Sequence, residues 1–501
     1  MISIVDVETE TSLDDYAAHA SLARPVEDLR AAARQTIDRL DGRTVWMMNS
    51  TAQGGGVAEM LPKVVSMLRD LGVSTEWAVL VSDEEGFFPL TKRIHNLIHG
   101  TGTPHLSEED ETLYRSVSEA CADGMARRVA PEDVVVAHDP QPLGTGALLK
   151  ERLGVPAVWR CHIGLDDRNE ATETAWSFLK PWATTYDQTV FSLREYVPSY
   201  LEDRSTIINP AIDPLSPKNR PLSVHALTEV LRRARLVQSG HPTIDRDFAQ
   251  PALRLQRDGS FEPATRPEDL GLLHRPIVAQ ISRWDRLKGF GPLLQGFARM
   301  KEQAFVDRYA TSARHRTRLT LTRLVLAGPD PDSVSDDPEG QEVFREICRR
   351  WQELPAEIQR DIAVLTLPMA SRHNNAMMVN ALQRCASIVA QNSRREGFGL
   401  TVTEGMWKRA PILGTHAAGI REQVTDGEHG RRLPESGDPK ALARTIHEML
   451  RAEEKRKEWA RNARRRVSEK YLVFTQVRRW LEVLARTVDQ RERAVDGSAV
   501  A

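Results

Sequence analysis

The chain has 501 residues, of which 41% are hydrophobic and 28% are charged, so it is long enough for at least two domains with sizeable cores. Its 68 lysines and arginines nearly balance 70 aspartates and glutamates, which argues against a nucleic-acid partner or an anionic membrane surface. The four cysteines show no paired spacing, and no apolar run approaches the roughly 18 residues of a membrane span. The first residues given are acidic and do not show the basic-then-apolar pattern expected of a secretory signal. These features predict a cytoplasmic protein.

The first half of the chain alternates buried strand patterns with helical ones. Residues 1–20 are polar and are expected to be loosely held, and residues 26–40 have a helical pattern. Strands are predicted at 44–49, 76–81, 134–138, 157–162, 189–193 and 206–212. Such alternation predicts a parallel sheet whose ligands bind at the carboxyl ends of the strands.

The pattern weakens from about residue 216 and resumes at 276. Strands are then predicted at 276–282, 324–327, 362–367, 387–390 and 411–414, followed by a helix at 474–488 and a disordered tail from 490. We therefore predict an N-terminal α/β domain over 1–220, joined by a C-terminal helix at about 472–490. A linker or insertion over 221–275 leads to a second α/β domain over 276–471.

The stretch 393–409 combines two carboxylates with a glycine turn at the expected start of a helix. Glu396 and Glu404 stand on either side of that turn, directly after a predicted strand. Backbone amides at a helix start can point at a ligand, and the two glutamates could bond sugar hydroxyls beside them. The spacing equally allows Glu396 to cap the helix and Glu404 to be solvated. The amides concerned belong to Gly397, Phe398, Gly399 and Leu400.

Glycines at 54–56 follow the first predicted strand of the chain. They could let the backbone approach a phosphate or a sugar, or they could simply form a tight turn. A dinucleotide-binding fingerprint would need a third glycine where Glu59 stands, which disfavours a dehydrogenase. No P-loop spacing is present either.

Asp139 and His162 each end or directly follow a predicted strand, so both could lie at the same sheet edge. A carboxylate and an imidazole suit hydroxyl recognition or proton handling. A lone histidine at a strand end is more often a structural hydrogen-bonding group. No set of His, Asp and Glu has the spacing of metal ligands, so no metal site is predicted.

Arg283 and Lys288 follow the first strand of the second half. A guanidinium grips phosphate oxygens with two bonds and an ammonium adds a point charge, so together they could neutralise a diphosphate without a metal. Taken alone, the spacing fits a solvated basic turn equally well.

The order of these three motifs, GGG, R-x4-K and E-x7-E, resembles the retaining GT-B glycosyltransferases of the glycogen-synthase and sucrose-synthase superfamily (glycosyltransferase family 4 type). Further stretches, over roughly residues 25 to 485, resemble the trehalose glycosyltransferring synthases, which join a nucleotide-activated glucose to free glucose. These stretches are NSTAQGGGVAEML (49–61), FFPLTKRIHN (87–96), HDPQP (138–142), WRCHI (159–163), FLKPW (178–182), PAIDPLSPKN (210–219) and REGFGLTVTEGMWK (395–408). The resemblance implies two Rossmann-like domains facing a central cleft, with a C-terminal helix crossing back to the first.

The resemblance also implies roles for the donor-side residues. Arg283 and Lys288 would hold the donor diphosphate and Glu404 the nucleotide ribose. Glu396 and the amides of Gly397, Phe398, Gly399 and Leu400 would take the donor glucose. Gly55 and Gly56 would lie against the donor.

On the acceptor side, His162 would lie near the reacting carbon, and Asp139 and His95 would address the acceptor sugar. The sequence departs from the family pattern at two places. Gly164 stands where such proteins often carry an acidic residue, and the 220–275 segment is longer than the family leads us to expect.

The resulting hypothesis is a retaining glycosyltransferase that moves glucose from a nucleoside-diphosphate glucose to free glucose, forming trehalose in a reversible reaction. It would use no cofactor and no metal, and its partners would be a sugar nucleotide and a sugar acceptor; a homodimer is compatible with this. The alternatives are a trehalose phosphorylase, an α-glucosyltransferase acting on another small acceptor or a glucan, and a regulatory protein on the same scaffold.

Overall fold

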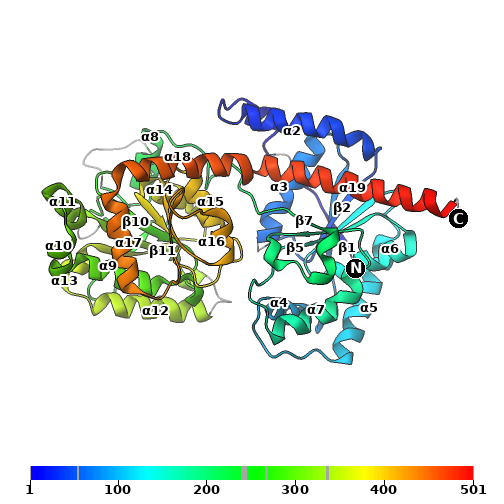
Figure 1. Cartoon of the computed structure of the whole chain (residues 1–501), viewed down its shortest axis with the longest axis horizontal. Coiled ribbons are helices and arrows are strands. Elements are labelled where there is room, and N and C mark those ends of the chain that lie inside the picture. The colour runs from blue at the N-terminus through cyan, green and yellow to red at the C-terminus, as the bar shows by residue number, and fades with distance from the viewer. Residues whose placement is uncertain are drawn as a thin grey trace. The chain divides into compact units, whose positions relative to one another are not determined.

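A computed structural model describes residues 2–8, 10–53, 56–238, 245–265, 269–333 and 338–499. The chain divides into two compact units, residues 1–211 with 473–501, and residues 212–472. Each unit is an α/β domain built around a sheet that is mostly parallel (Figure 1). The two-domain α/β architecture predicted from the strand and helix alternation is therefore confirmed.

The first unit has a sheet with the strand order β1-β3-β2-β4-β5-β6-β7. Neighbouring strands run parallel except β1, which pairs antiparallel with β3. The strands are β1 (Ile2–Val5), β2 (Val45–Asn49), β3 (Thr75–Leu80), β4 (Val134–His138), β5 (Ala157–Cys161), β6 (Gln188–Phe191) and β7 (Ser205–Ile207). The central strands are apolar runs buried on both faces, as expected where helices cover a parallel sheet.

The helices of the first unit are α1 (Leu13–Ala17), α2 (Ala23–Thr36), α3 (Gly56–Asp70), α4 (Phe87–Ile98), α5 (Glu108–Met125), α6 (Leu143–Leu153), α7 (Glu170–Ala183) and α19 (Val473–Ala499). Short 3-10 turns lie at η1 (Ile37–Arg39), η2 (Arg194–Tyr196) and η3 (Ser199–Arg204). α19 packs against α2 and α3, so the last helix belongs to the first unit, as predicted (Figure 1).

The second unit has a sheet with the order β15-β14-β13-β10-β11-β12-β8-β9. The strands from β15 to β12 run parallel, and β8 and β9 add an antiparallel hairpin beside β12. The strands are β8 (Leu253–Leu255), β9 (Phe261–Pro263), β10 (Ile277–Ile281), β11 (Arg323–Pro329), β12 (Ile362–Leu367), β13 (Ile388–Ala390), β14 (Ile412–Thr415) and β15 (Gly430–Leu433).

Alternate residues of these strands face two separate cores. Val278 packs with α9, α12 and α17, whereas its neighbours Ile277 and Ala279 pack with α8 and α14. The helices are α8 (Val224–Arg233), α9 (Phe290–Lys301), α10 (Gln303–Tyr309), α11 (Ala313–Leu321), α12 (Pro338–Gln352), α13 (Ala356–Arg360), α14 (Arg372–Cys385), α15 (Leu400–Trp407), α16 (Ala418–Gln423), α17 (Pro439–Arg451) and α18 (Glu453–Lys470), with 3-10 turns at η4 (Arg286–Lys288) and η5 (Pro331–Ser333).

Three regions differ from the sequence-based expectation. The prediction of loosely held residues at 1–20 is wrong, because β1 joins the sheet and α1 has a Ser12 capping box and buries Leu13 and Tyr16. The predicted disordered tail from residue 490 instead continues α19 as far as Ala499. The segment 221–275, expected to be a linker or an insertion, supplies α8, β8 and β9 to the second unit, and the unit boundary falls at 211–212.

Candidate functional site

The loop after β10 carries Arg283 and Lys288 at the carboxyl edge of the second sheet. β10 lies between β11 and β13 and runs parallel to both. The indole N–H of Trp284 donates to the carbonyl of Pro329 at the end of β11, at 2.7 Å, and the side chain of Gln280 donates to the carbonyl of Lys288, at 2.8 Å. Arg283, which directly precedes the anchored Trp284, is exposed. Its guanidinium is therefore accessible to a ligand above the strand ends.

The carboxylate of Glu396 joins this loop to the loop after β13. Its Oε2 accepts hydrogen bonds from Lys288 Nζ at 2.7 Å, Ser393 Oγ at 2.9 Å and Gln391 Nε2 at 3.0 Å. The side chain of Glu396 is only 8% exposed. Three donors converge on one oxygen, which fixes the carboxylate and keeps Oε1 as an acceptor for a hydroxyl. Glu396 is thus not the helix cap that the sequence also allowed.

Glycines make this close approach of the two loops possible. Gly289 adopts φ +64°, and a Cβ there would lie 2.1 Å from the backbone oxygen of Asn392. Gly399 adopts φ +82°, and a Cβ there would lie 2.8 Å from Cγ of Glu396. Any larger residue at either position would require a strained backbone, and at 289 it would also push the two loops apart.

Gln423 on α16 orients the peptide groups at the start of α15. Its Nε2 donates to the carbonyls of Phe398, with a short contact, and of Gly399, at 3.3 Å. Because N–H and C=O point in opposite directions in a trans peptide, the amides of Gly399 and Leu400 point away from Gln423. Two of the predicted amides thus lie at a helix N-terminus, a position that favours an anion or a sugar oxygen.

Glu404 is buried on α15, at 6% exposure, within a polar network. Its Oε2 accepts from Gln383 Nε2 at 3.4 Å, and its Oε1 lies 3.7 Å from Lys218 Nζ. Lys408 Nζ donates to Gln383 Oε1 at 2.7 Å and to Asn219 Oδ1 at 3.1 Å. A buried carboxylate held in this way is not the solvated helical residue that the sequence also allowed. No role was predicted for Gln383, Lys408 or Lys218: Lys408 and Lys218 lie in the quoted stretches 395–408 and 210–219, but the part that each plays follows only from its contacts.

In the first unit, Asp139 and His162 meet at the carboxyl edge, as predicted from the neighbouring strands. β4 and β5 pair in parallel, with His138 opposite Arg160. The backbone N–H of His162 donates to Asp139 Oδ1 at 2.8 Å, and Asp139 itself adopts φ +66°. Asp139 therefore shapes the turn that presents His162.

His138 fixes the protonation of the His162 ring. His138 Nε2 lies 3.4 Å from Met47 Sδ, a thioether that can only accept, so Nε2 carries the proton. His138 Nδ1 is then an acceptor, and His162 Nε2, at 2.9 Å, is its donor. Burial lowers the pKa of His138 to about 3 and that of His162 well below its usual value, so both rings stay neutral. This assignment leaves Nδ1 of His162 as a hydrogen-bond acceptor.

His95 and the glycines at 54–56 are the remaining residues predicted for the site. His95 lies on α4, where its ring centroid is 4.8 Å from that of His99, and burial lowers its pKa to about 4. Gly56 begins α3, whereas Gly54 and Gly55 fall outside the described residues.

Burial raises the pKa of Asp139 from 3.8 to about 6, against the opposing effects of the His162 N–H and of Arg160. Between pH 4 and 6 the folded chain holds this proton more tightly than the unfolded chain, so this group makes the free energy of unfolding fall as pH rises. We expect Asp139→Asn to remove that loss. The free energy of unfolding of the variant, compared with wild type, should rise by up to about 3 kcal/mol from pH 4 to above pH 6. Asn also tolerates positive φ and keeps an acceptor oxygen.

Thermal unfolding of both proteins between pH 4 and 7 measures this difference, with the exposed Asp203→Asn as the control. Parallel curves for wild type and Asp139→Asn would show that burial does not raise the pKa of Asp139.

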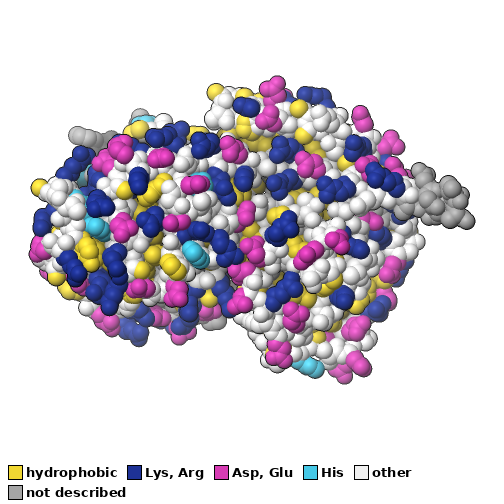
Figure 2. Space-filling view, viewed as in Figure 1, with side chains coloured by type: hydrophobic (Ala, Val, Ile, Leu, Met, Phe, Trp, Pro, Cys, Tyr) yellow, Lys and Arg dark blue, Asp and Glu magenta, His cyan; other side chains and the backbone are white. Residues whose placement is uncertain are grey.

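Two features are absent from the described residues. No group of three or more His, Cys, Asp or Glu side chains there is arranged to hold a metal ion. No helix in those parts of the chain has the length and apolarity that crossing a membrane requires. Figure 2 shows Lys and Arg interspersed with Asp and Glu over the visible face.

Each unit of the chain matches a known family of proteins. Residues 47–198 match the family model described as trehalose synthase, N-terminal domain, and residues 267–466 match glycosyl transferases group 1. The trehalose synthase of Thermococcus litoralis is 32% identical over 454 residues, which cover 90% of this chain and 93% of that protein. The chain belongs to the trehalose synthase family of GT-B glycosyltransferases. The family resemblance drawn from the motifs is confirmed.

A trehalose phosphorylase and a protein of known structure are also similar to this chain. The trehalose phosphorylase of Pleurotus sajor-caju is 25% identical over 458 residues, covering 87% of this chain but 57% of that protein. The structure of HepE from Anabaena in complex with UDP and glucose has a TM-score of 0.54 at 14% identity, covering 89% of this chain and 100% of that one. The HepE likeness shows a shared fold. The sequence relatives place the chain in trehalose-related glycosyl transfer.

Proposed function

We propose that the protein transfers glucose from a nucleoside-diphosphate glucose to free glucose, with retention of the α configuration, and so forms trehalose. The observation that carries this proposal is the Lys288–Glu396 contact at 2.7 Å, which sets a cation and a carboxylate side by side at the loop that also carries Arg283. A cation binds the oxygens of a diphosphate, and a carboxylate accepts the hydroxyl hydrogens of a hexose. Membership of the trehalose synthase family supports glucose as both donor sugar and acceptor.

The donor is bound by groups of the second unit. Arg283 and Lys288 contact the diphosphate, and the amides of Gly399 and Leu400 with Glu396 contact the hexose. Glu404 binds the ribose hydroxyls, with Gln383 donating to its carboxylate and Lys408 donating to Gln383 and to the backbone carbonyl of Glu404. The two cations take the part that a divalent ion plays in many nucleotide-sugar enzymes, so no metal is required.

The acceptor is bound by groups of the first unit, with Nδ1 of His162 accepting a hydroxyl hydrogen and Asp139 presenting the His162 turn. The bond between C1 and the phosphate oxygen breaks as the acceptor hydroxyl attacks C1 from the face that the nucleotide leaves. The hydroxyl proton passes to the departing phosphate. Arg283 and Lys288 stabilise the charge that develops on that phosphate, an effect that often dominates such catalysis.

We expect His138→Phe to lower kcat/KM roughly tenfold to a hundredfold, because the buried phenyl ring cannot accept the His162 Nε2–H bond. His138→Asn should recover much of this loss, since its Oδ1 takes the place of the lost Nδ1. Steady-state kinetics measures both effects, and thermal unfolding checks that the two variants fold equally well. Equal activity in the Phe and Asn variants would show that this bond does not position His162.

A phosphorylase is the second candidate, favoured by the similarity to the Pleurotus enzyme. The two reactions differ in the leaving group, which is a nucleoside diphosphate in one and inorganic phosphate in the other. Incubating the purified protein and free glucose with UDP-, ADP-, GDP- or dTDP-glucose, or with glucose 1-phosphate, separates them. We expect disaccharide only with a nucleotide sugar. Disaccharide from glucose 1-phosphate alone would establish the phosphorylase.

A further inference from the structure

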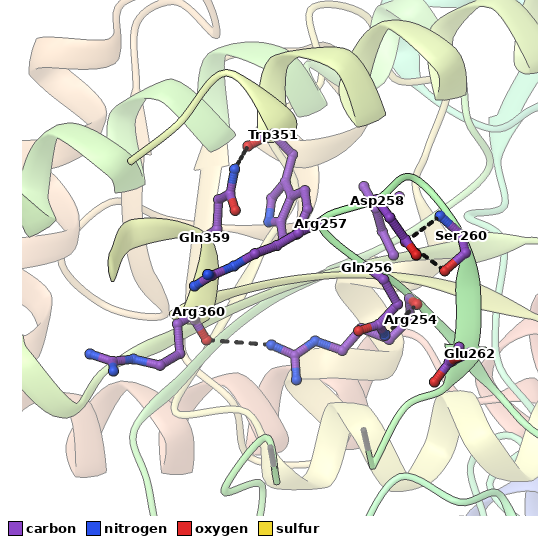
Figure 3. Close-up of a pocket in the computed structure, with 10 residues that line it drawn as sticks. Arg254, Gln256, Arg257, Asp258, Ser260, Glu262, Trp351, Gln359 and Arg360 are labelled. Atoms are coloured by element: carbon purple, nitrogen blue, oxygen red, sulfur yellow. Dashed lines mark hydrogen bonds between the residues drawn. The ribbon is translucent and has the colours of Figure 1, made fainter. Parts of the chain in front are cut away.

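A hollow of about 480 Å³ lies at the hairpin end of the second unit's sheet (Figure 3). Its walls come from the β8–β9 turn, the end of α12 and the end of α13. β8 runs antiparallel to β12, with Leu253 opposite Thr366 and Arg254 opposite Leu365. The β8–β9 turn therefore lies at the amino end of β12. Arg283, Lys288 and Glu396 lie at the opposite, carboxyl edge, so the hollow is separate from the donor loops.

The lining of the hollow includes several arginines. Arg254, Arg257 and Arg360 all line it. Arg254 is buried, at 5% exposure, and its Nη2 donates to the carbonyl of Arg360 at 3.4 Å. Figure 3 shows Arg257 extending from the turn toward Gln359 and Arg360, and its Nη2 donates to the carbonyl of Ala356 at 3.2 Å. Guanidinium groups offer only donors and match the oxygens of a phosphate group.

The other lining groups suit sugar hydroxyls. Asp258 accepts from the N–H and the hydroxyl of Ser260, at 3.0 and 2.7 Å, so this carboxylate faces Ser260. Glu262 on β9 adds a second carboxylate, and Gln359 is held by the carbonyl of Gln352 at 2.9 Å. The buried indole of Trp351, anchored to the carbonyl of Ile362 at 3.0 Å, supplies an apolar wall. Carboxylates and amides accept hydroxyl protons, and an aromatic wall packs on the C–H face of a sugar.

We infer that this hollow binds a phosphorylated monosaccharide, with the phosphate on the arginines and the sugar hydroxyls on the carboxylates and amides. The volume suits such a ligand, since small-molecule sites commonly measure roughly 300–1,000 Å³. The hairpin that forms the hollow comes from the segment 221–275, which is longer than the family resemblance led us to expect.

Isothermal titration calorimetry of the full chain with glucose 6-phosphate and with inorganic phosphate tests this inference. We expect glucose 6-phosphate to bind more tightly than phosphate. Arg257→Ala and Arg360→Ala, both at exposed positions, should each weaken the binding of glucose 6-phosphate roughly tenfold to a hundredfold. The exposed Arg461→Ala on α18 serves as the matched control, and the buried Arg254 is left intact.

Arg283→Ala separates this hollow from the donor loops, which could also bind a phosphate. Glucose 6-phosphate binding that survives Arg283→Ala and is lost in the two hollow variants supports the inference. Binding lost in Arg283→Ala but unchanged in Arg257→Ala and Arg360→Ala overturns it, as does the absence of binding to the wild type. Equal affinity for inorganic phosphate overturns the assignment to a phosphorylated sugar. None of these outcomes depends on the transferase reaction.

Discussion

Replacing Arg283 by alanine is expected to lower kcat for glucosyl transfer roughly a hundredfold to a thousandfold, the range found when a stabilising donor is removed from a developing anion. The exposed guanidinium lies just after β10, and Lys288, the other cation assigned to the diphosphate, is already paired with Glu396 and so cannot fully replace it. Steady-state kinetics with the preferred nucleotide sugar measures the effect. The loss should appear in kcat as well as KM, because the charge on the phosphate grows in the transition state.

Arg286→Ala provides the matched control for Arg283→Ala. Arg286 lies in the same loop and is also exposed, but it faces the α12 carboxylates Glu342 and Glu346, at 3.5 and 4.0 Å. An exposed ion pair of this kind contributes little to stability, so turnover should stay close to that of wild type. Equal effects of the two substitutions would mean that the loop needs positive charge in general and that Arg283 has no specific role.

Replacing Glu396 by glutamine is expected to lower kcat/KM roughly a hundredfold. The substitution keeps the shape of the side chain but removes the charge that pairs with Lys288, and it leaves only one acceptor oxygen for the three donors and the donor hexose together. If the amide nitrogen takes the place of Oε2, the bonds from Lys288, Ser393 and Gln391 are lost; if the oxygen stays there, the acceptor for the hexose is lost. Kinetics and thermal unfolding should be measured together.

The Lys288→Met and Lys288→Met/Glu396→Gln variants complete a double-mutant cycle for this pair. Because the two side chains touch, we expect their effects on kcat/KM to be clearly non-additive. Glu435→Gln, at an exposed carboxylate of the same unit, controls for the loss of one negative charge. Additive effects would mean that Lys288 and Glu396 act on the substrate independently.

Most strands could be predicted from the sequence because they are apolar runs with clear ends. The prediction at 134–138 coincides with β4 and that at 362–367 with β12, both buried along their whole length. β1 was missed because it is a half-buried edge strand in a polar stretch, and its position depends on pairing with β3. β8 and β9 have three residues each and carry charges, so only their neighbours in the sheet define them.

In the candidate site, too, some residues could be predicted from the sequence and others could not. The motif spacing pointed to Glu396, Lys288, Asp139 and His162, since each follows a strand that the pattern could locate. The partners that fix these groups could not be read from spacing. His138 contacts His162 through the register of β4 against β5, and Gln423 reaches the Phe398 carbonyl from another helix. Such contacts between segments distant in sequence exist only in the folded chain.

The most direct test of the proposed transfer is a proton NMR time course of the purified protein with a nucleoside-diphosphate glucose and free glucose, run alongside an assay of released nucleotide. We expect one product, with the anomeric signal of an α,α-linked disaccharide, to accumulate in step with the nucleoside diphosphate. A β-anomeric signal, or nucleotide release without any disaccharide, would contradict retaining transfer to glucose.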